Sequence, residues 1–227
     1  MSDTTRMAGS QQPEHARPLV PPTAAGAPSG ARLDLYWIPL GAGAHVVRIS
    51  GKTYEALAAL VQRRPRRDLY HSALIATVGD DASVIEMTPI PRDRGGHDRG
   101  VVGEGAVGTR WAGRFRIFRY ELRRWRGGVV PDLSFAVSSP VRVADVSTVV
   151  EQVLRLVPLV PTPVWGRDEL GAGEMWNSNS VISWVLTQAG ICAEAGVPPG
   201  GGRAPGWDAG VLVAQREVLR LPRPITA

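Results

Sequence analysis

The stretch that most constrains the fold is DLYHSALIATVGDDASVIEMTPI, in which two apolar, β-branched runs flank Gly79-Asp80-Asp81. Turn-forming residues between two such runs are typical of a β-hairpin. Its two-residue loop is either Gly79-Asp80 or Asp80-Asp81, and both choices put Glu86 on the same face as His71, because side chains alternate along a strand. The sequence therefore predicts an antiparallel pair with a histidine and a carboxylate on one side.

Other segments show strand or helix patterns on both sides of this hairpin. Strands are predicted at 33–40, 45–49, 113–125 and 133–143, with a bulge in the third near Ile117, and a loop is predicted at 92–110. Helices are predicted at 50–64, 145–157 and 178–189, followed by a short helix in the C-terminal stretch 197–219. Strands clustered between helices favour the α+β class.

The length and composition predict one domain with tails. A chain of 227 residues with 44% apolar content can bury one sizeable core. Residues 1–30 are rich in Pro, Gly, Ala, Ser and Gln without apolar periodicity, so we expect a disordered leader there. A single domain at 31–221 and a flexible tail at 222–227 complete the prediction.

The sequence favours a cytoplasmic protein. It contains no apolar run of about 18 residues, and its start lacks the features of a signal peptide. The only cysteine, Cys192, cannot form an internal disulfide, and no Cys/His group has the spacing of zinc ligands. We therefore expect neither a metal nor another cofactor.

Arginine supplies almost all of the positive charge. The net charge is +5, and Lys52 is the only lysine. Arginines cluster at 63–67 and 114–126, where they either attract phosphates or an anionic surface, or form ordinary solvated faces.

GEGAVG, at 103–108, fits a dinucleotide-binding pattern, but a strand-like run follows it where a helix is needed. A nucleic-acid partner is not expected, because no nucleic-acid-binding motif accompanies the arginines.

The predicted helix at 178–189 begins with Asn177-Ser178-Asn179-Ser180 and precedes Gly190, a typical helix-ending residue. One such polar side chain is enough to cap a helix. A serine in the first turn also benefits from the helix dipole and from free N–H groups that can bind an oxyanion. Serine needs a base, and His71 could supply it, with Glu86 orienting the imidazole.

LYHSALIATVGDDASVIEMTP together with the later WNSNSVISWVLTQAG resembles the circularly permuted papain-like hydrolases, the branch with NlpC-type peptidases and lecithin:retinol acyltransferase-like enzymes. In that branch a histidine opens a strand, a polar residue lies on the next strand, and an Asn-Cys pair opens a later helix. His71 matches the histidine, Glu86 the polar residue, and Asn177-Ser178 the Asn-Cys pair. The resemblance, over 33–214, implies an antiparallel sheet packed against helices, with the nucleophile position at a helix N-terminus.

The chain departs from this family at the nucleophile, where Ser178 stands in place of cysteine. A thiol is partly ionised near neutral pH and a hydroxyl is not, so the exchange usually removes most of the rate. Two expectations follow. One is an amidase, peptidase or acyltransferase that acts on an amide or ester of a small molecule, peptide or lipid through Ser178, His71 and Glu86. The other is a catalytically inactive papain-like scaffold that binds a peptide, a lipid or an anion.

Four further residues are candidates for substrate contact. Asn177 and Asn179 flank the nucleophile position, and Trp176 and Trp207 are candidate pocket walls. For the two tryptophans, ordinary packing of large apolar rings is the alternative.

Overall fold

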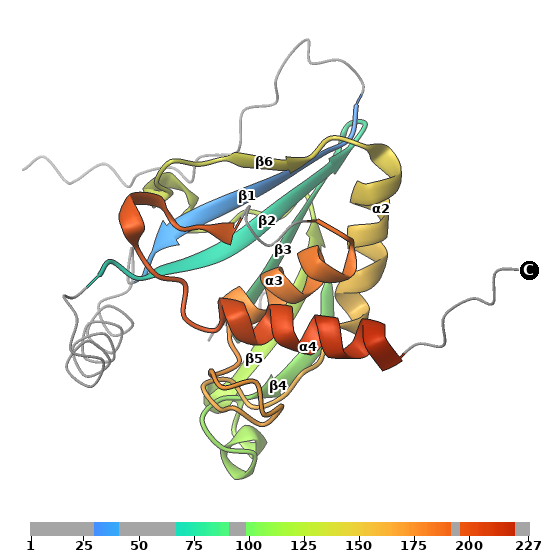
Figure 1. Cartoon of the computed structure of the whole chain (residues 1–227). Helices are drawn as coiled ribbons and strands as arrows, with labels where there is room; N and C mark the ends of the chain where they lie inside the picture. Colours follow the sequence, from blue (N-terminus) through green and yellow to red (C-terminus); the bar gives the residue numbers. More distant parts are fainter. Residues whose placement is uncertain (1–29, 41–66, 91–98, 192–195, 221–227) are drawn as a thin grey trace, which may run out of the picture.

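The computed structural model describes residues 30–40, 67–90, 99–191 and 196–220 (Figure 1). The predicted strand at 45–49, the predicted helix at 50–64 and the tail at 222–227 lie outside the described residues. So does the predicted leader, apart from residue 30.

The described strands form one six-stranded antiparallel sheet in the order β4-β5-β3-β2-β1-β6. Its strands are β1 (Arg32–Pro39), β2 (Tyr70–Val78), β3 (Asp81–Pro89), β4 (Val101–Ala106), β5 (Arg119–Arg126) and β6 (Val141–Ala144). The α-helices are α2 (Ser147–Leu156), α3 (Ser178–Gln188) and α4 (Trp207–Arg220), and they lie together on one side of the sheet in Figure 1. The predicted α+β class is confirmed.

The predicted hairpin is formed by β2 and β3. Val78 pairs with Asp81, so Gly79-Asp80 is the two-residue loop. Gly79 has a φ of 59°, in the left-handed region that glycine adopts without steric strain. The same register pairs Leu74 with Ile85, and its continuation puts Glu86 across from Ala73. This is one of the two registers that the sequence allowed.

Each face of the sheet carries its own apolar cluster. The larger cluster lies between the sheet and the helices and contains Leu33, Leu35, Trp37, Leu74, Ile85, Leu122, Val150, Val153, Ile182 and Val185. The smaller cluster lies on the opposite face and contains Ile38, Ala73, Ile75, Val84 and Val130, with Leu133 and Ala136 packed against it. Alternate residues of β2 therefore face the helices, and the residues between them face the smaller cluster.

Three sequence predictions differ from the structure. Residues 101–106 were expected in a loop but form β4, because they pair with the distant β5, and Gly105 faces the ring of Tyr120, where a Cβ would lie 2.4 Å from ring atoms. Residues 113–118 lie mostly in 3-10 turns, so the predicted strand begins only at Arg119 and has no bulge near Ile117. In the predicted strand at 133–143, only the stretch from Val141 is extended into the sheet.

Among the helices that the structure describes, none is both long and apolar enough to cross a membrane.

Candidate functional site

The start of α3 is a capping box. Asn177 is the N-cap, and its Oδ1 accepts the backbone N–H groups of Asn179 at 2.8 Å and of Ser180 at 3.4 Å. In return, Ser180 Oγ accepts the backbone N–H of Asn177 at 3.1 Å. These bonds satisfy N–H groups that a helix start leaves unpaired. Two of the four polar residues therefore have a structural role.

The same polar side chains also bind the loop that leads into α4. Asn177 Nδ2 donates to the carbonyl of Pro205 at 2.8 Å, and Ser180 Oγ donates to the carbonyl of Gly206 at 2.7 Å. Gly206 has a φ of 83°, and a Cβ there would lie 2.7 Å from Ser180 Oγ, so this close approach requires glycine. One turn further along, Ser183 Oγ donates to the carbonyl of Trp207 at 2.7 Å. The polar helix start thus fastens α3 to the beginning of α4.

Asn179 connects α3 to the sheet. Its Nδ2 donates to the carbonyls of Tyr70 and Pro205, both at 3.0 Å, and its Oδ1 accepts the hydroxyl of Ser72 at 2.9 Å. Both Asn179 and Ser72 are buried. A buried amide with three partners holds its neighbours in one arrangement. Asn179, predicted to contact substrate, is therefore occupied by structural hydrogen bonds.

The bond between Ser72 and Asn179 determines where His71 points. Ser72 faces α3, so His71, the preceding residue on β2, faces the opposite side of the sheet. There it pairs across the strands with Ile38, a member of the smaller apolar cluster. In the described part of the chain, no hydrogen bond joins His71 to Ser178. The structure therefore does not bring the predicted base to the predicted nucleophile.

The surroundings of His71 favour the uncharged imidazole. Burial lowers the pKa of His71 to about 4, because a charged ring would lose its hydration. At neutral pH the ring is therefore uncharged. This environment is typical of a structural histidine.

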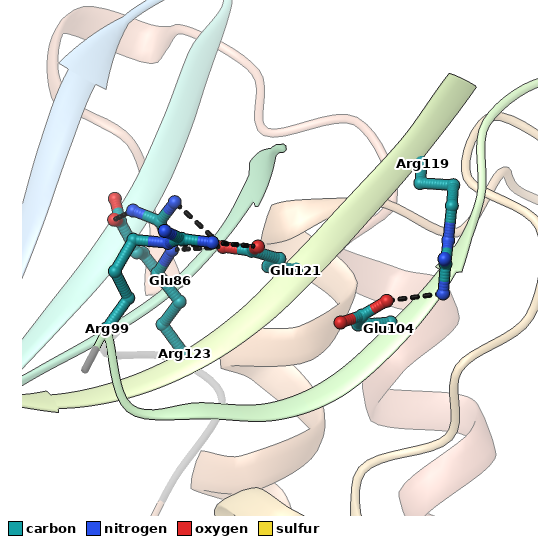
Figure 2. A network of polar contacts seen from close by, with 6 residues as sticks. All are labelled: Glu86, Arg99, Glu104, Arg119, Glu121 and Arg123. Atoms are coloured by element: carbon teal, nitrogen blue, oxygen red, sulfur yellow. Dashed lines mark hydrogen bonds and ion pairs between the residues drawn. The ribbon is translucent and has the colours of Figure 1, made fainter. Parts of the chain in front are cut away.

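Glu86 lies on the same face as His71, as predicted, but its carboxylate has a different partner. Arg123 Nη1 donates to Glu86 Oε1 at 3.2 Å, and Arg123 Nε donates to Glu121 Oε2 at 2.9 Å. Arg99 completes the group with bonds of 2.8 and 3.2 Å to Glu121 (Figure 2). Two carboxylates thus alternate with two guanidinium groups. Glu86 forms an ion pair with Arg123. Among the described residues, no hydrogen bond joins Glu86 to His71.

The carboxylates of this buried network have shifted pKa values in opposite directions. Burial raises the pKa of Glu86, although Arg123 partly opposes the shift. Burial also pushes the pKa of Glu121 upward, but hydrogen bonds from Arg99 and Arg123 outweigh it and hold the pKa below its usual value. The sequence did not predict this network, because the pairing of Glu86 with Arg123 depends on the register between β3 and β5, which are not neighbours in the sequence.

Ser178 is the first residue of α3, as predicted, and only 6% of it is exposed. Its hydroxyl makes no hydrogen bond with any residue that the structure describes. Trp176 and Trp207, the candidate pocket walls, are buried in the larger core cluster. The ring of Trp207 lies 5.2 Å from that of Trp37, measured between centroids. The contacts of both tryptophans are therefore those of core packing.

Two hollows on the surface, neither lined by a residue of α3, share the ion pair between Arg110 and Glu169 in their lining. Their volumes are about 330 and about 480 Å³. Both are lined by Arg110, Val164 and Glu169; Gly105, Ala106, Gly113, Arg119 and Thr162 line the first, and Gly108, Thr109, Arg167 and Asp168 the second. We call the two hollows together the arginine groove.

Protein donors already occupy the acidic side chains of the arginine groove. Glu169 accepts Arg110 Nε at 2.7 Å, Arg110 Nη2 at 3.1 Å and the backbone N–H of Val164 at 2.9 Å. The hydrogen bond from Arg110 holds the pKa of Glu169 below its usual value. Asp168 accepts the backbone N–H groups of Ala172 and Gly173. The carboxylates of Glu169 and Asp168 thus accept hydrogen bonds from the protein itself.

The arginines of the groove retain unused donors. A guanidinium group has five N–H bonds. Arg167 uses Nε on the carbonyl of Gly108, at 2.7 Å, and within the described chain its two Nη atoms bond to nothing. Arg119 pairs with Glu104 through one Nη atom (Figure 2). The arginine groove therefore has N–H donors that no acceptor among the described residues uses, and such donors can bind an anion. The sequence placed Arg119 in a basic cluster, but Arg167 became part of this site only through the fold.

Comparisons with protein-family models, curated proteins and solved structures yield no match. The geometry of the sites therefore carries the functional argument.

Proposed function

We propose that this chain is a binding protein without acyl-transfer activity, built on a papain-like scaffold, and that it holds an anionic ligand in the arginine groove. The observation that carries the proposal is the buried bond between Ser72 and Asn179, which turns His71 away from α3. Of the two expectations drawn from the sequence, the proposal adopts the binding scaffold.

Acyl transfer by Ser178 would require a base in contact with its hydroxyl. A serine hydroxyl becomes a nucleophile when a base within hydrogen-bond reach takes its proton. Ser178 lies at a helix start, where N–H groups favour an oxyanion, but the base that the sequence predicted lies on the other face of the sheet. An oxyanion site without a base does not activate a serine.

The order of the elements supports the papain-like scaffold. His71 is the second residue of β2, Glu86 lies on the next strand, and Asn177-Ser178 opens α3. This order matches that of the permuted hydrolases that the sequence resembles. We propose that the chain keeps this arrangement while its polar residues serve packing.

The groove supports an anionic ligand with a phosphate or carboxylate group. Arg110, Arg119 and Arg167 reach it from different segments, and Thr162 adds a hydroxyl. Guanidinium groups bind such oxygens with two parallel hydrogen bonds. The volumes of the hollows also fall in the range of small-molecule sites, about 300–1,000 Å³.

The test is a titration of the full chain with inorganic phosphate at constant ionic strength, followed by calorimetry. Arg167→Gln removes the unused donors, and we expect it to weaken binding at least about fivefold. Arg155→Gln is the matched control, because Arg155 is an exposed arginine of α2 outside the groove. Absence of saturable binding, or equal loss in both variants, would reject the proposed ligand class.

A further inference from the structure

Exposed apolar side chains gather at one end of the molecule, in the segment 110–118, which we call the tip. It contains the 3-10 turns η1 (Trp111–Arg114) and η2 (Arg116–Phe118), the green turns at the lower end of Figure 1, next to β4 and β5. Trp111 is 68% exposed, Phe115 48%, Ile117 65% and Phe118 47%. Neither turn contains a buried residue. Apolar side chains gathered in this way mark an interaction surface.

The charged residues in this stretch of the sequence are all arginines. Between residues 105 and 120 the charged residues are Arg110, Arg114, Arg116 and Arg119, and no acidic residue occurs. Arg110 and Arg119 pair with Glu169 and Glu104, which lie outside this stretch. The guanidinium carbon of Arg114 lies 3.8 Å from the centre of the Trp111 ring system. The tip is thus both aromatic and cationic, with the cations placed beside the rings.

We propose that the tip binds the surface of an anionic lipid bilayer. Trp111, Phe115, Ile117 and Phe118 enter the boundary between headgroups and acyl chains, and the arginines meet the lipid phosphates. Aromatic rings favour this boundary, and long arginine side chains reach the headgroups from it. Anionic lipids attract such basic segments.

The inference rests on the proposed function, because it identifies the anion of the arginine groove as a lipid headgroup. The tip and the groove share Arg110 and Gly113, and Arg119 follows the tip directly. A bilayer that accepted the tip would therefore bring its phosphates to the mouth of the groove. A membrane surface would thus provide an apolar partner for the tip and an anionic partner for the arginine groove.

Two other occupants fit less well. Single-stranded nucleic acid stacks its bases on exposed rings, but Arg114 already covers one face of Trp111. A second copy of the chain would bring the same patch against itself, because a two-fold interface is self-complementary, and arginines would then face arginines. A bilayer carries the opposite charge and needs no open ring face.

The test is sedimentation of the full chain with vesicles of phosphatidylcholine alone, or of phosphatidylcholine mixed with phosphatidylglycerol. We expect binding to the mixed vesicles and little to the neutral ones. Trp111→Ser with Phe115→Ser should weaken this binding at least about tenfold, because the two rings carry the buried apolar area. Both side chains are exposed, so the variant should keep the wild-type midpoint in urea. Phe135→Ser is the matched control, since Phe135 is exposed outside the tip.

Several outcomes overturn the inference: no binding to mixed vesicles, equal binding to both kinds, or equal loss with Phe135→Ser. Retention on single-stranded DNA without vesicle binding assigns the tip to nucleic acid, and a dimer that Trp111→Ser dissociates assigns it to a second copy. Phosphate titration separates the two proposals. Phosphate binding without vesicle binding rejects the membrane surface alone, and vesicle binding unchanged by Arg167→Gln, with no phosphate binding, rejects the groove.

Discussion

Ser72 Oγ donates a buried hydrogen bond of 2.9 Å to Asn179 Oδ1, and this contact links β2 to the first turn of α3. Because neighbouring residues of a strand face opposite sides, the same contact places His71 on the far face of the sheet. This contact is the reason for proposing the binding scaffold in place of the hydrolase.

The first prediction concerns reactivity. The native chain should not react with a fluorophosphonate probe, and Ser178→Ala should give the same background, because none of the described residues hydrogen-bonds the Ser178 hydroxyl as a base would. In-gel fluorescence of the labelled chain measures this. Strong labelling of the native chain that Ser178→Ala abolishes would support the hydrolase function. Activity that appears only in Ser178→Cys would indicate a dormant thiol site.

The second prediction contrasts neighbouring residues of α3. Asn179→Ala should lower the free energy of unfolding by roughly 3 kcal/mol, because it removes three buried hydrogen bonds and leaves the Ser72 hydroxyl without this acceptor. Ser178→Ala, one residue earlier, should change it by less than about 1 kcal/mol. Urea denaturation of both variants measures the difference. Equal effects would mean that Asn179 does not hold α3 to the sheet.

The third prediction concerns the buried ion network. Glu121→Gln should destabilise the fold by about 3 kcal/mol, since Glu121 pairs with both Arg99 and Arg123. Glu86→Gln should cost less, because Arg123 keeps its bond to Glu121 and burial already disfavours the charge of Glu86. Denaturation at neutral pH ranks the two variants. The reverse order would contradict the assignment of Glu121 as the centre of the network.

The fourth prediction is a loss of stability in mild acid caused by His71. Its pKa in the folded chain, about 4, is below the ordinary value of 6.5. At a pH between these two values, His71 is protonated in the unfolded chain but not in the native chain. Stability should therefore fall by roughly 2–3 kcal/mol as the pH drops from above 6.5 toward 4. Urea midpoints across this range measure the slope. His71→Leu should flatten it, and an unchanged slope would place the cause elsewhere.

A second acid-sensitive contribution comes from Glu121 at lower pH. Its pKa is depressed in the folded chain, so its stabilising effect is full above the ordinary value of 4.5 and is lost as the pH falls through the folded value. In the His71→Leu variant, this lower transition should remain.

The sequence predicted the local elements of the fold well. The hairpin, α2, α3 and the glycine after α3 all follow from short-range patterns, and Gly190 has the expected positive φ of 75°. β4 was missed because its glycine-rich sequence has little strand propensity and its pairing with β5 is not local. The turns at 111–118 were missed because alternation of arginine and aromatic residues looks like a strand, although no face of this segment is buried.

The candidate site could be predicted only in part, because pattern does not specify which face of a strand meets a helix. Alternation correctly put His71 and Glu86 on one side, and capping rules put Ser178 at a helix start. The choice between His71 and Ser72 as the residue that faces α3 depends on sheet packing over more than a hundred residues of separation. Arg123, the actual partner of Glu86, depended on the register of β3 with β5.

The most direct test of the account is a pH titration of the His71 ring by NMR in the native chain and in Ser178→Ala. We expect a neutral imidazole down to a pKa of about 4, with the same titration in both proteins. A pKa near neutrality that Ser178→Ala displaces would show that ring and hydroxyl touch, and would contradict the separation of His71 from α3.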